Sequence, residues 1–150
     1  MRRNTVTLLN YLYIWNSISF PLPPSSSQGE QERNYHIFYQ LCAGSDAALR
    51  ARLHLAAPDA FRYLARGCTQ YFGSEAAGAD RLSANQRKYG RLKDAMLDDA
   101  ADFGRVDRGL ASIGLDQEER FSVYTTIAAV LHLGNIEFQV SKVNILYENL

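Results

Sequence analysis

Residues 121–133 read FSVYTTIAAVLHL, and no other stretch of the chain says as much about the fold. The large apolar side chains cover two faces of a helix, and the polar residues among them are few and small. A helix that is apolar almost all round belongs inside a large protein or a membrane, and this run is too short for a bilayer, which needs about 20 apolar residues. We therefore expect a buried helix. In these 150 residues alone we expect one apolar face to point outward, because Phe121, Ile127 and Leu131 cannot all find cover.

The boundaries of this helix are marked on both sides. Asp116 stands at the expected N-terminal cap, and Glu119 follows three positions later, which is the spacing of a capping box. A glycine–asparagine pair at 134–135 closes the C-terminal end. Beyond it, residues 136–140 (IEFQV) alternate in polarity like a short strand. The pattern predicts a helix over 117–133 and a short strand near 136–140.

A second amphipathic helix precedes the first in the chain. A helix over 99–113, ended by Gly114, is predicted by apolar residues at helical spacing: Phe103, Val106, Leu110 and Ile113. Three carboxylates lie at its start: Asp98, Asp99 and Asp102. Neighbouring carboxylates can bind a metal ion, but capping and the positive end of the helix dipole explain these residues more simply. We therefore predict no metal site there.

The chain from residue 32 to about residue 65 is also helical in pattern. A helix is predicted over 32–43, and Gly44 follows at a position typical of a helix C-terminus. One face of this helix is polar and consists of Arg33, His36 and Gln40. A short helix is expected over 46–53, and Pro58 suits the first turn of another.

Periodicity is lost from Gly67 to Lys93, and we predict a largely irregular insertion over 70–93. The insertion is rich in basic residues: Arg81, Arg87, Lys88, Arg91 and Lys93. A basic loop interrupted by glycine can hold phosphate, but the sequence lacks the GxxxxGK[ST] pattern of a phosphate-binding loop. A solvated loop is therefore the favoured interpretation.

The composition narrows the class of protein. Lys and Arg number 16 and Asp and Glu number 16, so the formal net charge is zero, which argues against nucleic acid as a main partner. Apolar residues make up 47% of the chain, which argues against disorder throughout. Cys42 and Cys68 form no CxxC pair and no zinc-type spacing, so we expect two buried, reduced thiols.

Residues 1–27 differ in character from the rest. Arg2 and Arg3 precede an apolar run, which is the order found in signal peptides, but asparagine and serine dilute the run and no cleavage site stands out. The run is also too polar and too short to span a membrane. Residues 21–28 (PLPPSSSQ) have the composition of a linker. We expect neither a signal peptide nor a membrane span.

Two stretches carry a family resemblance. Residues 32–41 (ERNYHIFYQL) closely resemble the ERNYHIFYxL helix of myosin motor heads, and residues 130–138 (VLHLGNIEF) resemble the LHLGNIxF segment that follows it in those heads. Their order and separation also fit, so the chain is identified as a member of this family from about Gln28 to Gln139. The run RNYHIFYQLCAG from Arg33 and the RGCT stretch at 66–69, which an insertion follows, resemble the unconventional class VI.

The resemblance implies a mostly α segment of a myosin head, whose whole fold is an α/β domain of the P-loop NTPase type. It also implies a division of the chain. Residues 1–27 would be a non-homologous leader or linker, 28–140 a partial motor domain with a class VI-like insertion near 70–93, and 141–150 a non-homologous tail. A truncated or mis-spliced product, or an incorrect gene model, would explain both ends.

The function that the resemblance implies is that of an actin-based, ATP-driven cytoskeletal motor. ATP and Mg²⁺ would be its cofactors and actin filaments its partner, while light chains or calmodulin would bind outside this segment. The implied location is the cytoplasm, on the cytoskeleton and within a myosin complex. No nucleic-acid partner is expected.

Hydrolysis of ATP in that family needs a phosphate loop and two switches, and none of these occurs in the 150 residues. We therefore assign no catalytic, cofactor-binding or metal-binding residue. We expect the chain alone to be inactive and to bind neither ATP nor Mg²⁺ productively. His36, His54 and His132 are acid–base groups by type, but structural roles are favoured for each. The alternative function is a non-catalytic helical interaction or scaffold fragment.

Overall fold

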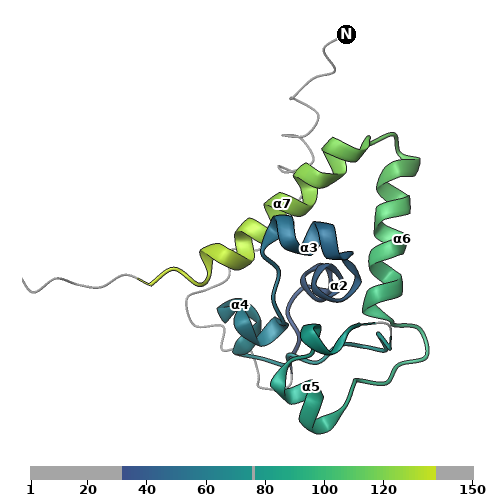
Figure 1. Ribbon diagram of the computed structural model, residues 1–150. Coiled ribbons are helices and arrows are strands. Elements are labelled where there is room, and N and C mark those ends of the chain that lie inside the picture. The colour runs from purple at the N-terminus through teal and green to yellow at the C-terminus, as the bar shows by residue number, and fades with distance from the viewer. Residues whose placement is uncertain (1–31, 76, 138–150) are drawn as a thin grey trace, which may run out of the picture.

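The computed structural model describes residues 32–75 and 77–137, and these ranges are mostly helical (Figure 1). In chain order the elements are α2 (His36–Gly44), α3 (Ala47–Leu53), the 3₁₀ turn η1 (Pro58–Ala60), α4 (Arg62–Ala65), the 3₁₀ turn η2 (Ala79–Arg81), α5 (Ala84–Tyr89), α6 (Asp99–Ser112) and α7 (Gln117–Leu133). Within the described ranges, β pairing is limited to one isolated parallel bridge between Phe72 and Leu92. The predicted mostly α fold class is confirmed.

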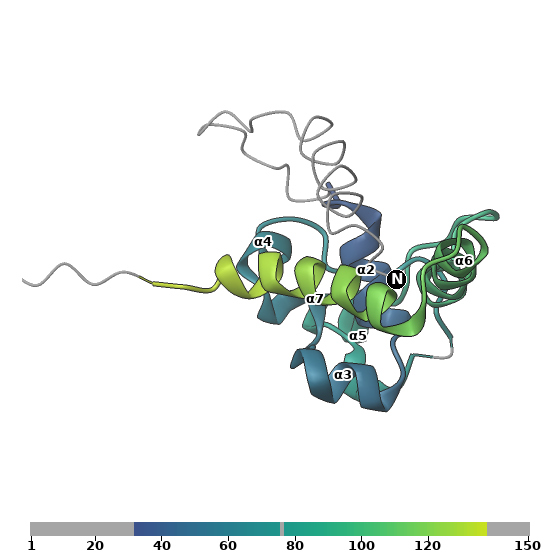
Figure 2. The ribbon, with the colours of Figure 1, turned by 90° about the horizontal axis from the view of Figure 1, so that it is seen from above.

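Helix α2 forms the centre of the molecule. Figure 1 shows it end-on, with α6 beside it, and Figure 2 shows α7 running across the molecule from the α6 side to the α4 side. A short helix so rich in apolar side chains is buried on most of its faces. The core around it consists mainly of Phe38, Tyr39, Leu41, Cys42, Phe61, Leu64, Tyr71, Phe103, Tyr124 and Leu131.

Helix α7 begins and ends where the sequence predicts. The carboxylate of Asp116 accepts a hydrogen bond from the Glu119 backbone N–H at 2.9 Å, and the Glu119 carboxylate accepts one from the Asp116 N–H at 2.9 Å, so the capping box is confirmed. One face is buried, with Leu131 fully enclosed, whereas Val130 is 40% and Leu133 is 62% exposed. An apolar face does point outward, but it carries Val130 and Leu133, whereas Phe121 and Ile127, which were expected to lack cover, are partly buried against the core.

The two described residues of the strand predicted near 136–140 do not form a strand. The backbone N–H of Ile136 donates to the carbonyl of Leu133 at 3.2 Å, so the chain is still turning out of α7 at this point. Ile136 and Glu137 are not in a strand. The remaining residues, 138–140, lie outside the described ranges.

Helix α2 begins at His36, four residues later than predicted. The side-chain oxygen of Asn34 accepts a hydrogen bond from the Tyr35 N–H at 2.7 Å, and the Asn34 N–H donates to the Tyr39 hydroxyl at 3.2 Å. These bonds hold the preceding backbone outside the helix. Arg33 is therefore not part of a polar helix stripe, and that interpretation is wrong.

Gly44 is the last residue of α2, and its lack of a side chain allows α6 to approach. A Cβ atom at this position would lie 2.4 Å from Cβ of Phe103 and 2.9 Å from the carbonyl oxygen of Ala100. Contacts this short do not occur between real side chains, so the spacing of the two helices depends on glycine here.

We predict that Gly44→Ala destabilises the chain by about 1–3 kcal/mol, because α6 must shift to admit the methyl group. The matched control is Gly109→Ala in α6, where the added Cβ would meet no heavy atom within 4 Å beyond the neighbouring backbone of its own helix. That change should stabilise the helix by about 0.5–1 kcal/mol. Chemical denaturation followed by circular dichroism measures both effects, and an equal response at the two glycines would contradict the prediction.

Candidate functional site

The insertion over 70–93 is largely irregular, as predicted, but it is not simply a solvated loop. It contains the six-residue helix α5, which Ser83 caps by accepting a hydrogen bond from the Gln86 N–H at 3.1 Å. Tyr71 is fully buried in the core and Ser83 is fully enclosed. The sequence missed this order because the buried residues follow no regular period.

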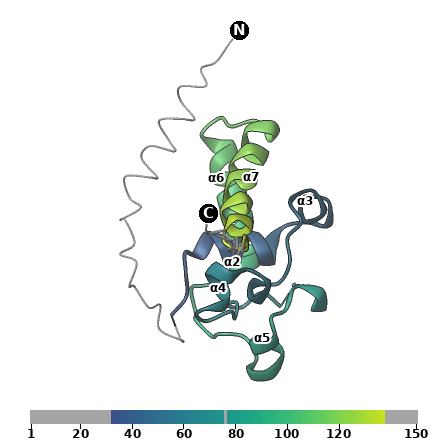
Figure 3. The same ribbon diagram turned by 90° about the vertical axis from the view of Figure 1, so that its left-hand side faces the viewer.

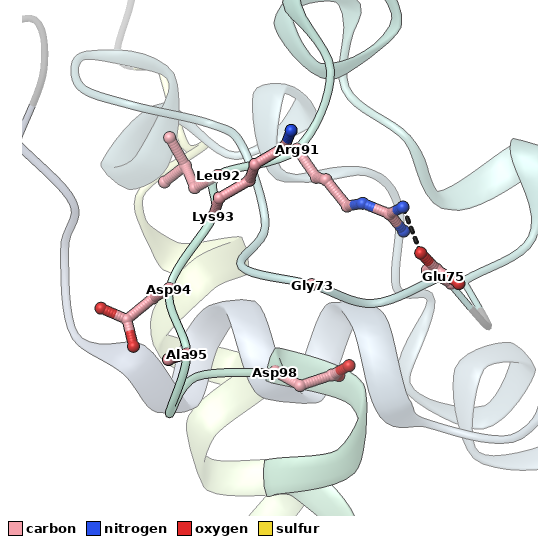
Figure 4. Close-up of a pocket in the computed structure, with 8 residues that line it drawn as sticks. All are labelled: Gly73, Glu75, Arg91, Leu92, Lys93, Asp94, Ala95 and Asp98. Atoms are coloured by element: carbon pink, nitrogen blue, oxygen red, sulfur yellow. Dashed lines mark ion pairs between the residues drawn. The ribbon is translucent and has the colours of Figure 1, made fainter.

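An open pocket of about 680 Å³ lies at the base of this insertion (Figure 4). It is lined by Gly73, Glu75, Arg91, Leu92, Lys93, Asp94, Ala95 and Asp98. Arg91 and Glu75 form an ion pair on one side of the pocket, as the dashed line in Figure 4 marks. The charge of this arginine is thus balanced within the pocket itself.

Asp98 and Gly73 form another part of the pocket lining. Asp98 caps α6 by accepting a hydrogen bond from the Ala101 N–H at 3.0 Å. Burial acts to raise the pKa of the Asp98 carboxyl, but several hydrogen bonds outweigh it, and the pKa lies below its usual value. Gly73 has a φ of +54°, and a Cβ there would lie 2.7 Å from an oxygen of Asp98. In this part of the lining, the Gly73 backbone packs tightly against Asp98, and the Asp98 carboxylate already accepts a hydrogen bond from α6.

A buried ion pair joins three parts of the chain beside the pocket. The guanidinium carbon of Arg33 lies 4.0 Å from the centre of the Tyr39 ring and 4.6 Å from the centre of the Phe72 ring. Its Nη2 atom donates to both oxygens of Asp99 at 2.9 and 2.8 Å. The Asp99 carboxylate also accepts the backbone N–H of Phe72 at 2.7 Å. Burial raises the pKa of this carboxyl, although Arg33 acts to lower it.

The three carboxylates at the start of α6 have three different roles. Asp98 is the cap, as predicted, and Asp102 accepts the Asp98 backbone N–H at 3.3 Å and pairs with Arg105. The prediction for Asp99 is incomplete, because its side chain turns into the core and pairs with Arg33 as well as lying at the positive end of the helix dipole. Among the described residues, no group of His, Cys, Asp and Glu is arranged to hold a metal ion.

The three histidines stand in three separate settings. Nε2 of His132 lies 2.9 Å from the carbonyl oxygen of Leu53, and its ring meets Phe61 edge-on. His54 ends α3 in the left-handed conformation, with φ of 50°. The ring of His36 stacks on Phe72 at 6.5 Å. His132 and His36 thus make packing contacts, and structural roles for the three histidines stay a prediction.

Both cysteines are buried and free, in agreement with the expectation of two reduced thiols. Burial raises the pKa of the Cys42 thiol to about 12. A thiol with such a pKa is a weak nucleophile at neutral pH, so Cys42 is a core residue.

The C-terminal end of α7 is fastened to the region of η1 and α4. The Asn135 amide donates to the Ala60 carbonyl at 2.8 Å and accepts the Arg62 backbone N–H at 2.8 Å. Gly134 lies against the Tyr63 ring, which a Cβ would approach to 2.3 Å. The stretch LHLGN at 131–135 is therefore joined to the preceding helices by both of its polar side chains, those of His132 and Asn135.

No helix in the described ranges is long and apolar enough to cross a membrane.

A sequence model of the family described as the myosin head (motor domain) matches residues 26–145. Unconventional myosin-VI of Sus scrofa is 51% identical over 116 residues, and that of Homo sapiens is 49% identical over 116 residues. Myosin heavy chain 95F of Drosophila melanogaster is 44% identical over 117 residues. Each match covers 75% of this chain, which spans 9% of the length of each of these relatives.

Proposed function

The chain belongs to the myosin head (motor domain) family, and we propose that it serves as a segment of an actin-based, ATP-driven motor of the class VI type. The observation that carries this proposal is the family match over residues 26–145, together with about half identity to unconventional myosin-VI over three quarters of the chain. Actin filaments are then the partner of the whole motor, which would be located on the cytoskeleton in the cytoplasm.

The structure supports the proposal through the contacts that the matched stretches make. Tyr39, in the first stretch, donates from its hydroxyl to the Cys68 carbonyl at 2.8 Å, within the RGCT run. His132, in the second stretch, contacts the Leu53 carbonyl. The first stretch thus holds the RGCT run, and the second is fastened to the end of α3. Holding these parts together is the role we propose for this segment within a motor head. The divisions at residues 27 and 141 stay predictions.

ATP and Mg²⁺ are the cofactors that the family implies, and the described residues do not fit them. Binding a triphosphate needs a backbone cradle and free cationic side chains. The pocket lining holds three carboxylates, those of Glu75, Asp94 and Asp98, against the two cations Arg91 and Lys93, and Arg91 is already paired with Glu75. We therefore assign no step of ATP hydrolysis to any residue of this chain.

We predict that the purified 150-residue chain does not hydrolyse ATP with or without actin filaments. The reason is the absence from its sequence of a phosphate loop and both switches. Actin-stimulated phosphate release measures this, with a complete myosin motor head as positive control. Turnover above the no-protein level that Arg91→Ala abolishes would contradict the prediction.

The alternative is a non-catalytic helical interaction segment, and one observation favours it. Large apolar side chains are exposed at the C-terminal end of α7 and beside it: Tyr63, Val130, Leu133 and Ile136. In a complete motor head, other parts of the head would cover such a patch. Both alternatives predict no ATP hydrolysis by the chain alone, so binding of the chain to the rest of a motor head is the assay that separates them. A motor segment should bind there, whereas an independent interaction segment should not.

A further inference from the structure

We propose that Arg81 acts as a pin that fixes the insertion onto the C-terminal end of α2. We call residues 70–92 the pinned segment. The segment packs against the rest of the molecule, and the Arg81 side chain near its tip sets its position. The proposal does not depend on the motor function.

The C-terminal end of α2 presents backbone carbonyl groups that need donors. The last carbonyls of a helix have no partner within the helix, and α2 ends in an extended residue, Ser45, instead of a left-handed glycine cap. Two arginines supply the donors. Arg50 donates to the Cys42 carbonyl at 2.6 Å. Nη1 of Arg81 donates to the carbonyls of Ala43 at 2.8 Å and Ser45 at 2.7 Å.

The two arginines differ in how far they reach along the chain. Arg50 comes from α3, eight positions from its acceptor, and is therefore a local contact. Arg81 is 36 positions from Ser45 and comes from the insertion. Hydrogen bonds from a charged donor are stronger than neutral ones, and the negative end of the α2 dipole favours a cation at this place. Arg81 thus connects the insertion to the central helix by two charge-assisted bonds.

The backbone of Arg81 is also held by a hydrogen bond from the core. Its carbonyl accepts the Tyr71 hydroxyl at 3.0 Å, and Tyr71 is fully buried. The Tyr71 N–H donates to the side-chain oxygen of Gln86 at 2.9 Å, which ties α5 to the same tyrosine. Arg81 therefore lies between two fixed points, α2 on one side and Tyr71 on the other.

The base of the pinned segment is closed by backbone bonds. The Leu92 N–H donates to the Tyr71 carbonyl at 2.8 Å, and the Gly73 N–H donates to the Leu92 carbonyl at 3.2 Å. In Figure 3, α5 lies at the opposite end of the molecule from the turn between α6 and α7, so the tip of the segment is far from that turn. The tip is held near α2 by Arg81, with Leu82 packed against the core and Asp59 accepting the Ala84 N–H at 2.8 Å.

The other arginines of the segment make contacts inside it. Arg87 donates to the Ala79 carbonyl at 3.2 Å, and Arg91 pairs with Glu75. Neither contact crosses to α2. Arg87 is therefore a matched control for Arg81, because it is the same residue type in the same segment with a local partner.

Hydrogen exchange of the full chain, followed by mass spectrometry, tests the pin. Arg81→Met keeps the apolar stem and removes the donors. We expect amides over 79–90 to exchange about tenfold faster or more in this variant, since local opening loses two charge-assisted bonds. Amides of α7 should keep their rates. Arg87→Met should leave both regions unchanged.

Three results would overturn the proposal. The first is equal exchange in Arg81→Met and Arg87→Met. The second is loss of protection in α7 of Arg81→Met as well, which would make the arginine part of the global core and not a local pin. The third is fast, unprotected exchange of the amides over 79–90 in the parent chain, because a docked segment must slow exchange. This result counts against the proposal whether α7 is protected or the whole parent chain is unfolded.

Discussion

Asp99→Ala is expected to lower the free energy of unfolding by about 3–5 kcal/mol, the range typical for removing one partner of a buried ion pair. Side chains of Arg33 and Asp99 are only 7% and 2% exposed. Nε and Nη1 of Arg33 already have no partner among the described residues, so losing Asp99 leaves a buried charge without a counterion. The Phe72 N–H also loses its acceptor. Urea denaturation followed by circular dichroism measures the loss.

The control for this prediction is the exposed pair on the same helix. Arg105→Ala breaks the contact with Asp102, and because Arg105 is largely exposed the change should stay within about 1 kcal/mol of the parent. A second variant tests the cause. Arg33→Met combined with Asp99→Ala removes the unpaired charge and should be more stable than Asp99→Ala alone. A loss below about 1 kcal/mol for Asp99→Ala would show that the pair does not hold this junction.

The Arg33–Asp99 pair also shows where prediction from the sequence ends. The two residues are 66 positions apart, and the sequence alone offers each a local interpretation, Arg33 as a polar helix position and Asp99 as an acid facing the helix dipole. No periodic pattern joins them. The contact exists because Tyr39 and Phe72 enclose the guanidinium group, and that enclosure depends on how α2, the insertion and α6 pack.

Local signals, by contrast, predicted the long helices well. The capping box at Asp116 fixed the start of α7, and the apolar spacing that ends before Gly114 located α6 to within one residue. These signals act over one or two helical turns, so the sequence carries them directly. The predicted start of α2 was wrong because the Asn34 side chain hydrogen-bonds to the neighbouring backbone and keeps it out of the helix.

The candidate site was less predictable for a physical reason. The insertion has no period to read, yet it is ordered by a buried tyrosine, a capped short helix and an arginine that reaches α2. Basic residues suggested a solvated or phosphate-binding loop. The structure places Arg81 on carbonyl groups and Arg91 on Glu75, so these charges are used within the chain.

The last prediction concerns which face of α7 supports the fold. Leu131→Ala should destabilise the chain by about 2–5 kcal/mol, because Leu131 is fully enclosed by the core and its removal leaves a cavity. Leu133→Ala, two positions later in the same helix, is the matched control. Leu133 is 62% exposed, so its loss should change stability by no more than about 0.5 kcal/mol.

The same pair of variants separates the packed face from the outward face by a second measurement. Binding of a hydrophobic dye to the folded chain should fall in Leu133→Ala, since that side chain contributes to the exposed patch with Val130 and Ile136. It should not fall in Leu131→Ala. Equal losses of stability at the two leucines would mean that α7 is enclosed on both faces in solution, for example by association of two chains. In that case the stability of Leu133→Ala would depend on protein concentration, whereas a helix packed on one face gives the same value at every concentration.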